Sequence, residues 1–81
     1  MSDATQIMNE ITFIITQDEH DGGYTARAHW PDGNRDIITE GDTREDLIRN
    51  IREALAVSFD EGEPAPNLIH LHFIRDEVIA R

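Results

Sequence analysis

The four histidines are the first side chains to consider for chemistry, because imidazole nitrogen is a common metal ligand. His70 and His72 are separated by one residue and therefore share one face of a predicted strand, whereas His29 falls on another strand. Two strand spacings of about 4.8 Å put His29 roughly 10 Å from His70. A stable zinc site takes three or four ligands, and the chain has no His-x-x-x-His or His-Glu-x-x-His pair. We therefore expect polar residues on a sheet face, and no metal or other cofactor.

The acidic residues form no recognisable catalytic pair, because those close in sequence fall in a turn or on exposed helix positions. General acid-base catalysis needs carboxyl groups held in a cleft that shifts their pKa values. A Ser-His-Asp arrangement is not credible, since Ser2 lies near the N-terminus and Ser58 lies on the apolar face of the predicted helix. We expect a protein that is not an enzyme. The carboxylates considered are Asp18, Glu19, Asp21, Glu45, Asp46 and Glu53.

Five residues have the side-chain types of a contact surface, in which arginine, tryptophan and aromatic residues are enriched. Most of them fall on the predicted sheet face that points away from the helix. Trp30, at a strand end, has an equal alternative as a core anchor. We take as candidates for a partner interface Arg27, His29, Trp30, His70 and His72.

Four segments have the composition of strands. Residues 11–16 are mostly β-branched and aromatic, which suits a central strand. Residues 24–29 alternate between apolar and polar side chains, and 36–40 form a short third strand. Residues 68–75 carry apolar side chains at 69, 71 and 73 on one face and histidines at 70 and 72 on the other. Turn-forming residues at 17–23 predict a hairpin after the first strand, and the Pro-x-Gly stretch in 30–34 predicts a turn after the second.

A helix is predicted from Arg44 to about Glu61. Thr43 has the type and position of an N-cap, with an acid three residues later. Glycine and prolines at 62, 64 and 66 end the helix. Val57, beside Ala56 and off the main apolar stripe, is a weak indication of self-association. The predicted apolar face comprises Leu47, Ile48, Ile51, Ala54, Leu55, Ser58 and Phe59.

The order β-β-β-α-β predicts an α+β fold in two layers. A helix that returns the chain from the third strand to lie parallel beside the first places the first strand centrally. We expect sheet order 3-2-1-4 with one face open. The 81 residues form one domain, with a loose start over 1–7 and a short tail over 76–81.

Composition limits the partners. Seventeen acids against seven arginines give a formal net charge of −10, which disfavours direct nucleic-acid binding and suits a basic protein partner. The apolar runs are too short to span a membrane, and the start lacks the basic and apolar regions of a secretory signal. With no cysteine in the chain, we expect a cytoplasmic protein.

Four segments in this order and spacing resemble the HicB-type antitoxin family, including its short single-domain members. The resemblance covers roughly residues 11–59. The segments are Ile11-Thr12-Phe13-Ile14-Ile15, Asp21-Gly22-Gly23-Tyr24-Thr25-Ala26-Arg27, Thr39-Glu40-Gly41-Asp42-Thr43-Arg44-Glu45-Asp46-Leu47 and Asn50-Ile51-Arg52-Glu53-Ala54-Leu55.

The resemblance implies a degraded RNase H-like domain that binds and occludes a small basic mRNA interferase of the HicA type, without chemistry of its own. It also implies a homodimer or tetramer. Family members usually carry a Pro-Gly-Cys-like turn before the third strand, whereas this chain has a longer and more polar loop at 30–35. Full antitoxins append a DNA-binding domain, and we expect none here. The alternatives are a small-ligand or regulatory module without a toxin and, more remotely, a metal-dependent nuclease.

Overall fold

A computed structural model describes residues 10–31, 34–75 and 79–81, and it arranges them as four strands and one helix. The strands form one sheet in the order β3-β2-β1-β4. β1 pairs antiparallel with β2 and parallel with β4, while β2 pairs antiparallel with β3. The expected α+β layout and strand order are thus confirmed; the expected loose start at 1–7 lies outside the described residues, as do 32–33 and 76–78. The elements are β1 (Glu10–Gln17), β2 (Tyr24–Trp30), β3 (Arg35–Gly41), α2 (Arg44–Ser58) and β4 (Leu68–Ile74).

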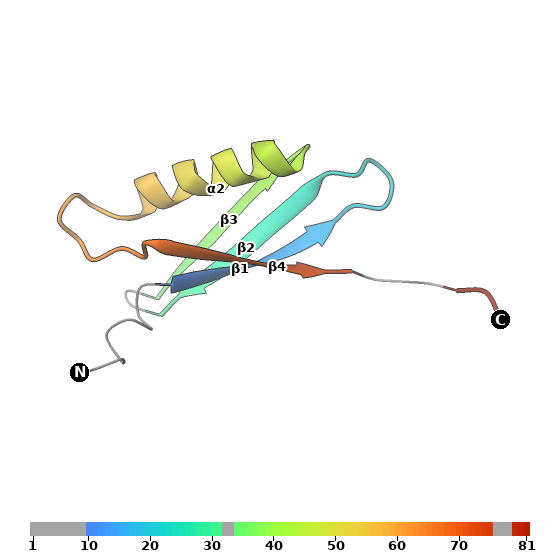
Figure 1. Cartoon of the computed structure of the whole chain (residues 1–81). Helices are drawn as coiled ribbons and strands as arrows, with labels where there is room; N and C mark the ends of the chain where they lie inside the picture. Colours follow the sequence, from blue (N-terminus) through green and yellow to red (C-terminus); the bar gives the residue numbers. More distant parts are fainter. Residues whose placement is uncertain (1–9, 32–33, 76–78) are drawn as a thin grey trace.

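The core lies between α2 and one face of the sheet (Figure 1). Strand side chains alternate between the two faces. Residues 11, 13 and 15 of β1 and 26, 28 and 30 of β2 are buried, and the residues between them are exposed except Ile14, which is partly buried. Phe13 at the centre of β1 has no exposed surface, as expected for a central strand. The buried residues are Ile11, Phe13, Ile15, Ala26, Ala28, Trp30, Ile37, Leu47, Ile51 and Phe59.

The connection from β3 to α2 is tight. A Cβ added at Gly41 would lie 2.6 Å from the Cα of Leu47 and 2.9 Å from the carbonyl carbon of Asp46, so only glycine lets the first helical turn pack this closely on the strand. Thr43 is extended and its Oγ1 accepts a hydrogen bond of 3.1 Å from the Asp46 amide. The predicted N-cap is therefore confirmed.

The helix ends at Ser58, three residues earlier than predicted. Phe59 leaves the helix in an extended conformation and is buried against Trp30, with the two rings edge to face at 5.9 Å between centroids. Packing of Phe59 in the core thus ends the helix before the glycine and prolines are reached. Gly62, at φ +86°, belongs to the turn that follows.

The helix covers the sheet unevenly. α2 packs mainly on β3 and less on β2 (Figure 1). β4 at the opposite edge is consequently less well covered, and none of its seven residues is fully buried.

Candidate functional site

The sheet face opposite α2, here called the open face, carries four of the five candidate interface residues. Arg27 and His29 alternate with buried alanines along β2, so their side chains point away from the core. His70 and His72 alternate with Leu71 on β4 and are also exposed. Among the described residues no helix covers this face. Sequence reasoning therefore placed these four side chains correctly.

Arg27 and His72 belong to one row of residues across the open face. Ile14 pairs with Arg27 on one side and with His72 on the other, and Arg27 pairs in turn with Ile38 on β3. Directly opposed residues have Cβ atoms about 4.5–5.5 Å apart. The row thus places a guanidinium and an imidazole on either side of an isoleucine, with the exposed Ile38 at its end.

The other two histidines of the open face, His29 and His70, each lie beside a carboxylate on a neighbouring strand. His29 Nδ1 and Asp36 Oδ1 are 2.7 Å apart, and His70 Nδ1 lies 3.5 Å from Glu10 Oε2. All four side chains are substantially exposed, so solvent screens these pairs. Each pair puts an imidazole and a carboxylate side by side, at two separate points on the open face.

Trp30 lies on the other side of the sheet. It is 6% exposed and its ring packs on Phe59 in the core. The alternation of β2 explains this, because Trp30 shares the face of Ala26 and Ala28. Trp30 is therefore a core residue, and its candidacy as an interface residue is corrected. Its indole Nε1 is buried and has no hydrogen-bond partner among the described residues.

In the part of the chain that the structure describes, the histidines and carboxylates meet only in pairs. Within 10–31, 34–75 and 79–81 there is no group of three or more His, Asp or Glu residues placed to hold one metal ion. The rings of His70 and His72 lie edge to face, with centroids 6.3 Å apart.

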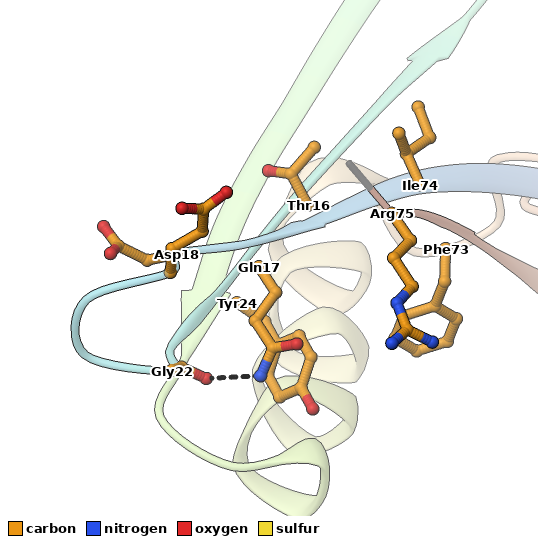
Figure 2. Close-up of a pocket in the computed structure, with 9 residues that line it drawn as sticks. Thr16, Gln17, Asp18, Gly22, Tyr24, Phe73, Ile74 and Arg75 are labelled. Atoms are coloured by element: carbon orange, nitrogen blue, oxygen red, sulfur yellow. Dashed lines mark hydrogen bonds between the residues drawn. The ribbon is translucent and has the colours of Figure 1, made fainter. Parts of the chain in front are cut away.

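A hollow of about 460 Å³ lies at the end of the sheet where β1 turns into β2 (Figure 2). Tyr24 and Phe73 pack edge to face in it, 6.1 Å between ring centroids. Beside them, the side-chain Nε2 of Gln17 donates a 3.1 Å hydrogen bond to the Gly22 carbonyl (Figure 2). Aromatic and charged residues thus line the hollow together: Thr16, Gln17, Asp18, Glu19, Gly22, Tyr24, Phe73, Ile74 and Arg75.

Two carboxylates of this hairpin shape the turn. Asp18 Oδ1 accepts hydrogen bonds from the amides of His20 at 2.7 Å and Asp21 at 3.3 Å. Asp21 Oδ1 accepts one from the Gly23 amide at 2.8 Å. Such side-chain to backbone bonds are typical of turns, so these acids have a structural role and show no catalytic geometry.

Sequence reasoning missed the acidic and apolar residues of the open face. Glu10, Asp36, Ile38 and Glu40 are exposed there, and Ile38 is 66% exposed. Alternation within 36–40 could have placed Asp36, Ile38 and Glu40 together on one face. The contact between Glu10 and His70 could not have been predicted, because it depends on the parallel register of β1 and β4.

These features define a small acidic α+β protein with a helix on one face of a four-stranded sheet and a polar open face. A UPF0150 protein of Thermotoga maritima is 39% identical over 75 residues, which cover 93% of this chain and 97% of that protein. The chain therefore belongs to the UPF0150 family.

No protein-family model matches the chain. No solved structure matches it either. Within the described residues, no helix is both long and apolar enough to cross a membrane.

Proposed function

We propose that this protein is a non-enzymatic binding protein that docks a small basic protein on its open face, in the manner of a HicB antitoxin that occludes a HicA-type mRNA interferase. The observation that carries the proposal is the charge. A net charge of −10 over 81 residues attracts a basic protein and speeds its association.

The composition of the open face supports the same partner. Glu10, Asp36 and Glu40 supply exposed carboxylates, while Arg27 and the histidines supply hydrogen-bond donors between them. The partly buried Ile14 offers apolar contact at the centre of the face, and the exposed Ile38 adds apolar surface at its β3 edge. An interface commonly combines an apolar centre with a polar rim. Inhibition by such docking needs no catalytic group, because covering the partner's active surface is sufficient.

The test is a pull-down with the product of the adjacent gene, followed by titration calorimetry at low and high salt. We expect binding to a short basic protein and weaker binding as salt rises, since exposed charges are screened. If the adjacent gene encodes no short basic protein and its product does not bind, the antitoxin proposal fails.

A small-ligand or regulatory module is the second candidate, and the hollow at the hairpin end is the observation that favours it. Its volume is in the range of small-molecule sites, but its lining mixes charged residues with Tyr24 and Phe73. An NMR titration with a metabolite library tests it. Shifts of the Tyr24 and Phe73 resonances would favour a small-ligand module over a protein that docks its partner on the open face.

A metal-dependent nuclease is the remaining alternative. Such an enzyme needs several carboxylates around its metal ions, whereas the candidate face carries Arg27 and histidines besides separate acids. Incubation of the purified protein with RNA and Mg²⁺ or Mn²⁺ tests it, and we expect no cleavage.

A further inference from the structure

We propose that two copies of this chain join through β4, by antiparallel pairing of the two β4 strands about a two-fold axis at Leu71. The dimer forms from this chain alone and does not depend on the basic partner. It contains one continuous eight-stranded sheet, in the order 3-2-1-4-4-1-2-3.

β4 has a free edge. It lies at one end of the sheet, and no other described strand pairs with its outer side. A free edge presents unpaired amides and carbonyls, which natural proteins protect with charged residues, proline or a short strand. β4 has seven residues, none of them proline, aspartate, glutamate, lysine or arginine. The edge is therefore open to strand addition.

Exposed apolar side chains also lie on both faces of β4. Leu68 is 59% exposed and Phe73 is 46% exposed, and Ile69 and Ile74 are also exposed. Pairing with another strand would cover part of each of these side chains.

Charge favours β4 over β3 as the edge at which two copies meet. Two chains of net charge −10 repel each other, so close approach is least unfavourable where neither carries an acid. The other edge strand, β3, contains Arg35, Asp36 and Glu40, and like charges opposed across a strand pair are destabilising. Of the two edge strands, β4 is the one that has no Asp, Glu, Lys or Arg.

The sequence of β4 is nearly palindromic, Leu-Ile-His-Leu-His-Phe-Ile. Antiparallel pairing centred on Leu71 opposes Leu68 to Ile74 and Ile69 to Phe73, so that each apolar residue meets another. It also opposes each His70 to the His72 of the other copy. A two-fold interface requires this kind of self-complementarity, which an arbitrary partner strand would not match.

Cysteine cross-linking tests the register, because the chain has no cysteine of its own. In the proposed pairing the two residues at 71 face each other, within the Cα separation of roughly 4.4–6.8 Å that a disulfide needs. The two residues at 69 are four positions out of register, roughly 13 Å apart. We expect Leu71→Cys to form a covalent dimer on mild oxidation, seen on a non-reducing gel, and Ile69→Cys to form none although it still associates without a disulfide. No Leu71→Cys dimer, or equal cross-linking of both variants, would overturn the proposal.

Sedimentation equilibrium on the cysteine-free chain provides a second test that does not depend on Leu71. The double variant His70→Lys, His72→Lys changes only exposed residues of the open face. In the proposed dimer it opposes a lysine of one copy to a lysine of the other, so we expect the dimer dissociation constant to rise about tenfold or more. Ile38→Lys, on the β3 edge, should leave the constant unchanged. Melting followed by circular dichroism checks that all variants fold. A wild-type chain that stays monomeric at millimolar concentration, or equal weakening by Ile38→Lys, would contradict the inference.

Discussion

Arg35 and Glu63 connect the start of β3 to the turn that follows α2. The guanidinium of Arg35 hydrogen-bonds both the Glu63 carboxylate and the Ser58 carbonyl at the helix end. It also lies over the Phe59 ring, with Cζ 4.5 Å from the ring centroid. One arginine thus holds the helix end, its final aromatic residue and the following turn against the sheet edge.

This arrangement makes the stability of the protein depend on the charge of Glu63. Hydrogen bonds from Arg35 and then from the Asp60 amide hold the pKa of Glu63 below its ordinary value of 4.5. A carboxyl whose pKa is lowered by folding stabilises the protein above its unfolded-state pKa, and loses that contribution as pH falls through the folded-state pKa. We expect Glu63→Gln to lower the urea midpoint at pH 7, and the difference from wild type to shrink as pH falls below about 4.5.

Glu61→Gln is the matched control, because Glu61 is exposed in the same turn. It should leave the urea midpoint nearly unchanged at both pH values. A Glu63→Gln effect that is constant from pH 7 to pH 3 would show that the charge on the carboxylate is not what stabilises the turn.

Replacing Gly41 should lower the stability of the protein. Because a Cβ there would overlap backbone atoms of Asp46 and Leu47, Gly41→Ala must push α2 off β3. We expect a loss of about 2–4 kcal/mol, within the range of severe single substitutions. At Gly23 the nearest atom to an added Cβ is Oδ1 of the Asp21 side chain, at 3.3 Å, so Gly23→Ala should cost distinctly less. Denaturant unfolding of the two variants measures the difference; equal losses would contradict the close-approach argument.

The sequence predicts the strands, their order and the faces of β2 and β4, because these depend on alternation within each strand, on the short turns that join β1, β2 and β3, and on the helical return from β3 to β4. Gly41 and Thr43 are local signals, and the junction that they form is as predicted. The helix end was wrong by three residues because burial of Phe59 beside Trp30 is a tertiary effect that no local pattern contains. The placement of Trp30 was left open for the same reason: its neighbour on β3 is Arg35, whose contacts with the helix end appear only after folding.

Thr43 should contribute to stability through its side-chain hydroxyl. Its Oγ1 satisfies the Asp46 amide, one of the helix amides that has no partner within the helix. Thr43→Ala should cost about 1 kcal/mol, whereas Thr43→Ser, which retains the oxygen, should cost less. Thermal unfolding at pH 7 compares them, and identical losses would mean that the hydrogen bond is not the cause.

Trp30 should matter for folding through its ring and not through its N–H group. The indole nitrogen has no partner among the described residues, so Trp30→Phe removes no hydrogen bond and retains an aromatic contact with Phe59. We expect Trp30→Ala to cost about 3–5 kcal/mol and Trp30→Phe to cost substantially less. Urea unfolding provides both values, and an equal loss in the two variants would show that the N–H group does have a stabilising partner.

The open face can be distinguished from the helix side as the binding surface by removing one charge from each. Glu40 is exposed on the open face of β3, and Glu53 is exposed on α2. Glu40→Gln and Glu53→Gln change the net charge of the protein equally, so a general effect of charge on association would be the same for both. If the basic partner docks on the open face, Glu40→Gln should weaken binding by roughly two- to fivefold, the size expected of an exposed ion pair, and Glu53→Gln should change it much less. Titration calorimetry with the partner at constant salt measures both, and a larger loss for Glu53→Gln would move the interface to the helix.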